Sequence, residues 1–302
     1  MELGDRVNRL INGDALKIVG QMPSQSIDCV ITSPPYWHQR DYGWAGQWGL
    51  EPVLEDYLEK LWGLMDELKR VLKPMGTLWI NMADTYGTQL YKKNEIIKTT
   101  RHGRTPHKSL LLIPHRFAIG CMERGWIVRN DIVWSKSNAS PEKVCDRFIN
   151  RHEYLFFMAK SPSYYFDMDS IRDPYSESSL TRGQYEVPVY GTTSESRKIA
   201  LGKGKRNGGI LKKMILNVLG KIPGSVSDLW SVANRHGKEK HYATYTDEII
   251  RKPILAGCPE GGIILDPFAG IGTTGAEAKR LGRKYILIEG SKEYCRIAES
   301  RL

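Results

Sequence analysis

The chain has 302 residues, of which 41% are hydrophobic and 26% are charged, so its length allows one large domain or two modest ones. This composition excludes fibrous and disordered proteins, and no apolar run approaches the roughly 18 to 20 residues that span a bilayer. Its first residues lack the basic and apolar segments of a signal peptide, so we expect a cytoplasmic protein with no membrane partner. The net charge of +10 favours a polyanionic partner.

Five cysteines are scattered along the chain without a C-x-x-C pair: Cys29, Cys121, Cys145, Cys258 and Cys295. Their spacing predicts neither a disulfide framework nor a zinc site, and no other metal site is suggested. Thiols with a packing role are the simpler interpretation.

The first half of the chain alternates strand and helix patterns. An apolar, β-branched run at 26–31 predicts a buried strand that ends before Pro34-Pro35. Apolar residues recur with helical spacing over 53–72, and Lys73-Pro74 is expected to close this helix. Further strands are predicted at 77–81, 126–128 and 132–134, and a helix with proline in its first turn at 114–124.

Residues 161–240 differ in character, because glycine, serine, lysine and arginine dominate them. We interpret this segment as an inserted, basic, loop-rich module with partial order; a disordered surface loop is the alternative. The earlier alternation then resumes with a helix at 247–256, a strand at 263–265, a helix at 274–281 and a strand at 285–288. This alternation predicts an α/β protein with a mostly parallel sheet.

A glycine-rich turn, 270–275, follows one predicted strand and opens a helix, which is the setting in which backbone approaches a cofactor closely. Glu289 ends the next strand, where it would accept hydrogen bonds from ribose hydroxyls, so the turn predicts an adenosine-type cofactor. NAD and S-adenosylmethionine both fit this pattern. We favour the sulfonium cofactor, because Asp266 precedes the glycines and because a hydride-transfer domain needs more strands than follow Gly275.

The tetrad Ser33-Pro34-Pro35-Tyr36 follows a buried strand at its carboxyl end, where open α/β sheets bind ligands. Proline lacks an N–H, so its carbonyl faces a ligand without a competing donor. Ser33 Oγ and the Pro34 carbonyl would accept both hydrogens of an exocyclic amine, and Tyr36 would stack on a base extruded from the duplex. A strand terminator followed by a core aromatic is the simpler alternative.

These two motifs resemble those of the β-class DNA amino methyltransferases, which carry a Ser/Asn/Asp-Pro-Pro-Tyr/Phe motif near the N-terminus and an Asp-Pro-Phe-x-Gly-x-Gly-Thr-Thr motif near the C-terminus. Asn12-Gly13-Asp14 also matches the family, and there Asp14 would face the cofactor adenine. The resemblance implies four catalytic residues, Ser33, Pro34, Pro35 and Tyr36. It implies ten residues that bind the cofactor: Asp14, Asp266, Pro267, Phe268, Ala269, Gly270, Gly272, Thr273, Thr274 and Glu289.

The family fold is a Rossmann-like methyltransferase domain with permuted motif order, a mixed, mostly parallel sheet and helices on both faces. We therefore expect a catalytic half (1–160), a target-recognition region (161–240) and a cofactor-binding half (241–302). Serine in the first position of the tetrad usually marks N4-cytosine enzymes. The resemblance thus implies S-adenosylmethionine-dependent N4-cytosine methylation of double-stranded DNA with base flipping, in a restriction-modification system with a cognate endonuclease, by a monomer or homodimer in the prokaryotic cytosol or nucleoid.

Three alternatives stay open at this point: N6-adenine methylation by the same fold, a nicotinamide-dependent oxidoreductase and a non-catalytic nucleic-acid binding module. A basic stretch at 92–108 is expected to lie over the site as a loop, or to be a solvated surface. Asn81 and Asp84 end a strand beside the tetrad, where a capping or turn role competes with catalysis. The segment 241–247 departs from the family pattern, so its role is undefined.

Overall fold

The structure is a computed structural model that describes residues 3–87, 90–92, 95–97, 107–138, 143–172, 226–233 and 245–302. It consists of two units, one formed by Met1–Phe166 with Asp228–Leu302 and the other by Asp167–Ser227. In the second unit, the described residues include one short 3-10 turn, η2 (Asp169–Ile171). The elements that follow belong to the first unit.

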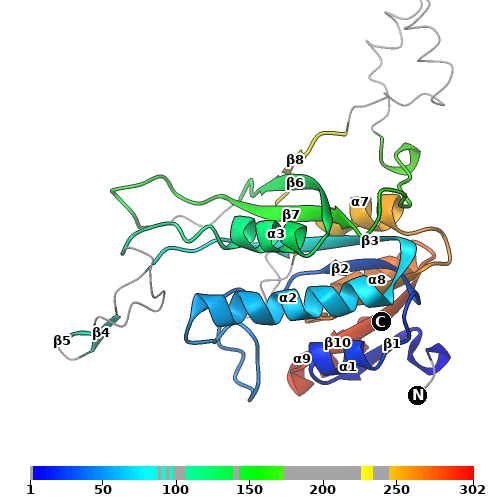
Figure 1. Ribbon diagram of the computed structural model, residues 1–302, viewed down its shortest axis with the longest axis horizontal. Helices are drawn as coiled ribbons and strands as arrows, with labels where there is room; N and C mark the ends of the chain where they lie inside the picture. The colour runs from blue at the N-terminus through cyan, green and yellow to red at the C-terminus, as the bar shows by residue number, and fades with distance from the viewer. Residues whose placement is uncertain are drawn as a thin grey trace, which may run out of the picture. The chain divides into compact units, whose positions relative to one another are not determined.

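The first unit is built on an eight-stranded sheet with the order β1-β10-β9-β2-β3-β7-β6-β8 (Figure 1). Strand β7 runs antiparallel to both of its neighbours, and the other pairings are parallel. The strands are β1 (Arg9–Asn12), β2 (Ile27–Thr32), β3 (Leu72–Met82), β6 (Ile127–Ser135), β7 (His152–Ala159), β8 (Leu229–Ser231), β9 (Ile263–Asp266) and β10 (Lys284–Glu289). A separate antiparallel pair joins β4 (Leu90–Lys92) to β5 (Glu95–Ile97).

Helices cover both faces of the sheet. In Figure 1, α1 (Ala15–Gly20), α2 (Leu54–Val71) and α3 (Ile113–Glu123) lie in front, and α7 (Asp247–Gly257) and α8 (Thr273–Arg280) lie behind. Helix α9 (Lys292–Glu299) packs against β1 and β10, and a 3-10 turn, η1 (Gly4–Arg6), precedes β1. The predicted fold class, a mixed, mostly parallel sheet between two helical layers, is confirmed.

Successive residues of the central strands enter two separate cores. In β3, Leu78 and Ile80 pack beneath α2 and α3, whereas Trp79 packs on the other face with residues of α7. In β10, Ile288 and Leu287 divide in the same way. Because side chains alternate across a strand and both faces are covered, a central strand reads as a continuous apolar run.

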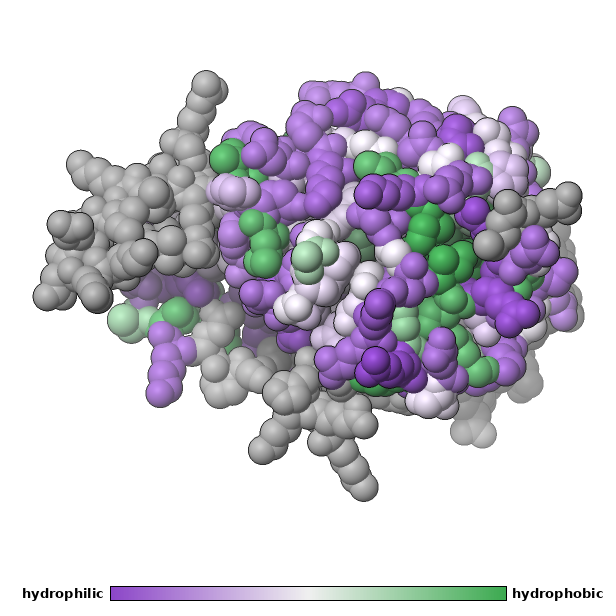
Figure 2. Space-filling model, turned by 90° about the horizontal axis from the view of Figure 1, so that it is seen from below, coloured by the Kyte–Doolittle hydropathy of each residue, from purple (hydrophilic) through white to green (hydrophobic). Residues whose placement is uncertain are grey.

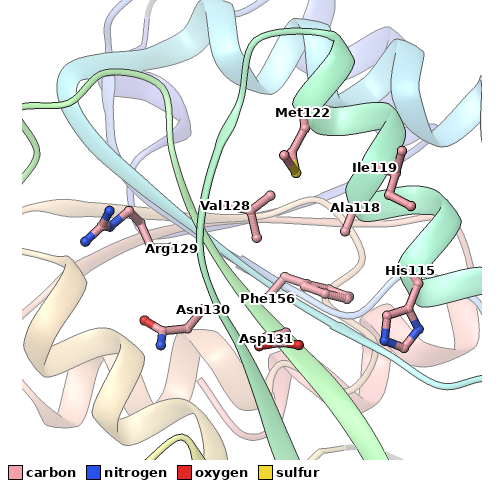
Figure 3. A pocket seen from close by; sticks show the side chains of 9 residues that line it. All are labelled: His115, Ala118, Ile119, Met122, Val128, Arg129, Asn130, Asp131 and Phe156. Atoms are coloured by element: carbon pink, nitrogen blue, oxygen red, sulfur yellow. The ribbon is translucent and has the colours of Figure 1, made fainter.

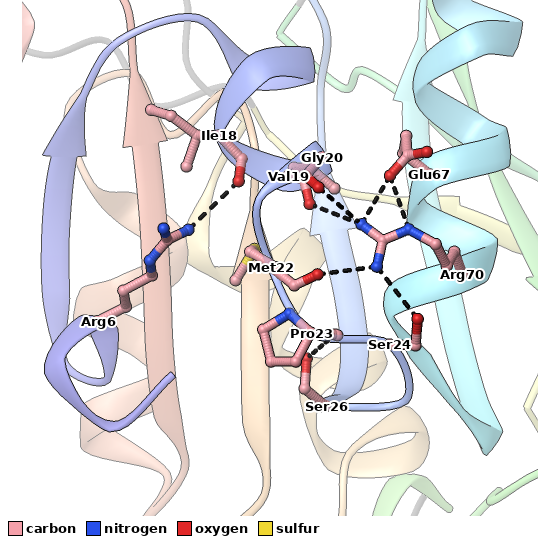
Figure 4. Close-up of polar contacts among 10 residues, drawn as sticks. All are labelled: Arg6, Ile18, Val19, Gly20, Met22, Pro23, Ser24, Ser26, Glu67 and Arg70. Carbon is pink, nitrogen blue, oxygen red and sulfur yellow. Dashed lines mark hydrogen bonds and ion pairs between the residues drawn. The ribbon is translucent and has the colours of Figure 1, made fainter. Parts of the chain in front are cut away.

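Arg70 of α2 fastens the connection between α1 and β2 (Figure 4). Its guanidinium donates to the carbonyls of Val19, Gly20 and Met22 at 2.8 to 3.3 Å and pairs with Glu67. A cation at the carboxyl end of a helix satisfies carbonyls that have no partner within the helix. This contact holds the start of the strand that leads to the tetrad.

The structure differs from the sequence prediction at several boundaries. Strand β3 begins at Leu72 and includes Pro74, because a register shift against β2 absorbs the residues that cannot pair regularly. The two strands predicted at 126–128 and 132–134 are one strand, β6, in which β7 pairs with the backbone of the polar residues between them. Strands β1 and β7 and helices α1 and α9 were not predicted. Elements β1 and α1 have only 4 and 6 residues, whereas β7 has a clear apolar run at 155–159.

The described surface is mostly polar. Figure 2 shows one face on which hydrophilic side chains (purple) predominate and apolar ones (green) gather in limited patches. Among the described helices, none has the length and apolar character that crossing a membrane requires.

Candidate active site

Sheet topology brings the two predicted motifs side by side. Strand β2, which leads into the tetrad, pairs in parallel with β9, which leads into the glycine turn. At the carboxyl ends of these strands, Thr32 Oγ1 donates a hydrogen bond of 2.7 Å to Asp266 Oδ1. Residues from opposite ends of the chain therefore share the edge at which parallel sheets bind ligands.

The glycine turn is shaped by two residues with left-handed backbone. Gly270 has φ 53° and Gly272, at the start of α8, has φ 79°. A Cβ atom at Gly272 would approach Ala298 Cβ to 3.0 Å, whereas one at Gly270 would meet nothing within 4 Å. Gly272 is thus required for packing against α9, and Gly270 presents open backbone beside the turn.

Asp266 is fully buried and holds the turn together. Its Oδ1 accepts from Thr32 Oγ1 and from the Phe268 amide, and its Oδ2 accepts from Tyr245 Oη at 2.9 Å and Thr274 Oγ1 at 2.5 Å. Burial raises the pKa of this carboxyl above its ordinary value, while these four donors oppose the rise. Protein donors occupy its four acceptor positions, so it organises the site from within.

Glu289 lies at the end of β10, beside the glycine turn. Its Oε2 accepts from the Gly270 amide at 2.8 Å and its Oε1 from the Ser291 amide at 2.7 Å, which leaves acceptor capacity on each oxygen. Burial raises the pKa of Glu289 to about 7. The structure therefore joins this predicted ribose-binding residue directly to the turn.

Asp14 lies just beyond the neighbouring strand β1, whose last residue, Asn12, pairs with Glu289. It caps α1 by accepting from the Lys17 amide at 3.0 Å, and its other oxygen accepts from Trp48 Nε1 at 3.0 Å. The Trp48 ring also packs edge-on against Phe268, with ring centroids 5.1 Å apart. The segment after the tetrad thus covers the ends of β1 and β9, a contact that the sequence did not predict.

In the tetrad, the two prolines are used differently. The Pro35 carbonyl accepts from Tyr57 Oη at 2.8 Å, whereas the Pro34 carbonyl has no partner among the described residues. Ser33 Oγ donates to Tyr36 Oη at 3.3 Å. The structure therefore leaves available the two acceptors that the sequence assigned to an exocyclic amine, Ser33 Oγ and the Pro34 carbonyl.

Tyr36 is held through its hydroxyl by a polar network. Tyr36 Oη donates to Glu153 Oε2 at 2.7 Å, and Asn81 Nδ2 donates to both Tyr36 Oη (2.5 Å) and Glu153 Oε2 (2.6 Å). Lys136 Nζ donates to the other oxygen of Glu153. Burial and the nearby Glu153 carboxylate raise the pKa of the Tyr36 phenol well above its ordinary value.

Sequence reasoning assigned no role to Lys136 or Glu153. The available signal was an acidic residue within the otherwise apolar run of β7, where Glu153 is 8% exposed. Asp84, whose role was left open, accepts from the Thr85 amide and from the Ile113 amide at the start of α3, so it caps that helix. Asn81, which was grouped with it, instead contacts Tyr36.

The comparisons with known proteins agree with this geometry. A family model described as DNA methylase, covering N6 and N4 enzymes, matches residues 27–300. The chain belongs to this family. The resemblance to β-class DNA amino methyltransferases is thereby confirmed, and the oxidoreductase and the non-catalytic binding module are set aside.

Relatives extend over the full length of the methylase. It is 36% identical to the type II methyltransferase M.Cfr9I of Citrobacter freundii, over 97% of this chain and 87% of that protein. It is 33% identical to M.SmaI of Serratia marcescens, over 100% and 93%. The fold is shared with PvuII DNA methyltransferase (cytosine-N4-specific), with a TM-score of 0.63, 16% identity and coverage of 97% and 85%. It is also shared with TTHA0409 from Thermus thermophilus, complexed with S-adenosyl-L-methionine, with a TM-score of 0.57, 22% identity and coverage of 98% of this chain and 94% of that one.

Other predicted parts of the methylase lie largely outside the described residues. These are most of the basic stretch at 92–108, most of 161–240, and residues 241–244. Tyr245, which follows them, is described and contacts both Asp266 and Thr274 through its hydroxyl. The segment that departs from the family pattern therefore contributes at least one side chain to the glycine turn.

A shallow cavity of about 250 Å³ lies between α3 and β6 (Figure 3). Its walls include Ile119, Met122, Phe156 and Asp131. It is smaller than typical cofactor pockets, and none of the predicted site residues lines it. The candidate active site of the methylase is therefore the edge formed by the ends of β1, β10, β9, β2 and β3.

Proposed function

We propose that this DNA methylase transfers a methyl group from S-adenosyl-L-methionine to N4 of cytosine in double-stranded DNA. The observation that carries the proposal is Ser33, the first residue of the tetrad, beside the strand that ends in the glycine turn. The type II relatives support a role in restriction-modification, with a cognate endonuclease as partner. We further propose a cytoplasmic enzyme that acts as a monomer or homodimer.

The residues around the glycine turn fit the cofactor. The open backbone at Gly270 would lie against it, Glu289 would accept from ribose hydroxyls, and Asp14 would face the adenine. The remaining predicted residues, Pro267, Ala269 and Thr273, lie in the same turn, where the Ala269 amide donates to the Ile288 carbonyl. The complex of TTHA0409 with S-adenosyl-L-methionine supports this choice of cofactor. When bound, it supplies an electrophilic methyl on a sulfonium.

The tetrad would orient the target amine. Ser33 Oγ and the Pro34 carbonyl would accept its two hydrogens, which favours a pyramidal nitrogen whose lone pair faces the methyl group. The Tyr36 ring would stack on the flipped base, because the amine is out of reach within the duplex. Transfer would need no covalent bond between enzyme and base, so catalysis would depend mainly on positioning and desolvation. The amine would lose its proton to water or to acceptors that are hydrogen-bonded to Ser33.

We propose that 1–160 is the catalytic half, 161–240 the target-recognition region and 241–302 the cofactor-binding half. The basic residues of 92–108 and 161–240 would contact phosphates, which position the enzyme without specifying sequence. Binding to DNA would therefore weaken steeply with salt. An affinity that does not change between low and moderate salt would contradict this assignment.

N6-adenine methylation is the second candidate, because the matching family model spans both N6 and N4 enzymes and both reactions need the same geometry. The deciding experiment incubates the full chain with radiolabelled cofactor and unmethylated genomic DNA, followed by nucleoside mass spectrometry. We expect label in N4-methylcytosine. Label in N6-methyladenine would transfer the proposal to adenine, and no label in either would refute it.

A further inference from the structure

Three donors converge on the carboxylate of Glu153, which comes from β7 and is 8% exposed. Lys136 Nζ pairs with Oε1, while Tyr36 Oη and Asn81 Nδ2 both donate to Oε2. The pairing of β6 with β7 holds Lys136 here, because the Lys136 amide donates to the Arg151 carbonyl at 2.8 Å. As the ion-pair partner of a lysine, Glu153 is a carboxylate and therefore an acceptor only.

This arrangement fixes the direction of every hydrogen bond around Tyr36. The phenol has one hydrogen, and the carboxylate, which has none, takes it. Asn81 presents its amino group, which also only donates. The phenol oxygen is therefore left as an acceptor toward Ser33.

The same constraint extends to Ser33. Its hydroxyl hydrogen is directed at Tyr36 Oη over 3.3 Å, so the Ser33 oxygen keeps its lone pairs for another donor. We propose that Glu153 is a positioning residue that sets the polarity of this chain, so that Ser33 meets the target amine as an acceptor. The inference rests on the proposed role of Ser33 and holds for either base.

An amide in place of the carboxylate cannot do this. Glutamine has one acceptor oxygen and an amino group, so it cannot serve Lys136 on one side and two donors on the other. The amino group would either oppose Lys136 or donate to the Tyr36 oxygen. In the second case the Tyr36 hydrogen is free to turn toward Ser33, which reverses the chain.

The first test measures single-turnover methyl transfer by the full-length enzyme on unmethylated genomic DNA, together with cofactor affinity by calorimetry. We expect Glu153→Gln to slow transfer by roughly 100-fold, the effect of a misplaced reacting group, with cofactor affinity unchanged. Tyr36→Phe keeps the stacking face and removes the hydroxyl, so it should slow transfer by a similar factor. The double variant should be no slower than the slower single variant, because both changes break one chain.

Asp28→Asn is the matched control. Asp28 pairs with Lys73 at 2.7 Å, and its side chain is 12% exposed, close to the 10% of Glu153. It lies on β2, however, and accepts from the Ile263 amide at the start of β9, at the opposite end of these strands from the tetrad. This variant should keep the wild-type transfer rate. If Glu153→Gln transfers as fast as the control, or if the effects of Glu153→Gln and Tyr36→Phe multiply, the proposed chain is wrong.

A readout that does not need turnover is the ¹³Cζ chemical shift of Tyr36, assigned by its absence in Tyr36→Phe. It should move in Glu153→Gln and not in Asp28→Asn, and an unmoved shift would overturn the proposal. If Glu153→Gln does not fold, the test rests on the Tyr36 ¹³Cζ shift of the wild-type enzyme and on the methyl-transfer rate of Tyr36→Phe. A Tyr36→Phe transfer rate equal to that of wild type refutes the proposal. A wild-type enzyme that transfers no methyl would instead refute the proposed function.

Discussion

Two buried carboxylates organise the two halves of the candidate site, and they are neutralised differently. Asp266, beneath the glycine turn, takes four donors from uncharged groups, and no described lysine or arginine pairs with it. Glu153, behind the tetrad, has Lys136 as counter-ion. The first carboxylate ties together the glycine turn, whereas the second takes the Tyr36 hydrogen, which in the proposed chain leaves the phenol oxygen as an acceptor toward Ser33.

The two regions also differ in how complete they are. Around Asp266 the donors and acceptors match within the protein. Near the tetrad, Asn81 Oδ1 and Asp84 Oδ2 are buried without a partner among the described residues, and the Pro34 carbonyl is likewise free. Buried acceptors without donors are costly, so they are tolerated where a ligand supplies the donor. This contrast fits the proposed assignment of the glycine turn to the cofactor and of the tetrad to the target base.

The strongest test of this contrast removes the acceptor at the base site. Ser33→Ala should slow methyl transfer by roughly 10²- to 10³-fold, as the loss of one positioned polar group does, with little change in cofactor affinity. Single-turnover rates and calorimetry separate the two effects. Full activity in this variant would refute the role assigned to Ser33.

The corresponding change at the turn should act on stability. Asp266→Ala leaves four donors without their acceptor, two of them in buried hydrogen bonds, and should lower the free energy of unfolding by about 3 kcal/mol, measured by urea denaturation. Tyr245→Phe removes one of these donors and leaves the other three in place, so its cost should be about 1 kcal/mol. Equal losses in the two variants would show that Asp266 does not organise the turn.

The raised pKa of Glu289 gives the turn a pH dependence. In the folded protein the Glu289 carboxyl keeps its proton up to about pH 7, whereas its ordinary pKa is 4.5. The free energy of unfolding therefore falls as the pH rises from 4.5 to about 7, and is constant above that. If the ionised form accepts from ribose hydroxyls, cofactor affinity should rise about tenfold from pH 6 to pH 8. Calorimetry would measure it, and Glu289→Gln should abolish the slope. A slope that persists in that variant belongs to another group.

The smallest expected effects come from the two glycines of the turn. Gly272→Ala should cost about 1 to 2 kcal/mol of stability, because φ is 79° and Ala298 lies 3.0 Å from the new Cβ. The Cβ atom added in Gly270→Ala meets no protein atom, so this variant should lose only about 1 kcal/mol of stability through backbone strain. It should weaken cofactor binding more than Gly272→Ala does. Equal cofactor affinities in the two variants would place the cofactor away from Gly270.

Local sequence patterns were sufficient to predict much of the secondary structure of this protein. Continuous apolar runs bounded by Pro34-Pro35 and by Asp266-Pro267 predicted β2 and β9, because a strand covered on both faces needs such a run. The same patterns missed β1 and α1, whose few residues carry little periodicity. They divided β6 in two because its polar centre breaks the apolar pattern while its backbone pairing continues.

The sequence by itself determined the reaction family, since two motifs with defined chemistry occur in a defined order. Only the tertiary structure decided which groups serve them. Asp266 is among the residues that the sequence assigns to the cofactor, and in the structure its oxygens accept from Thr32, Phe268, Tyr245 and Thr274. Glu153 reaches Tyr36 from β7, far along the chain, and Lys136, which follows β6, pairs with Glu153. Hydrogen-bond partners of this kind depend on strand order and register, which residue patterns along one segment do not contain.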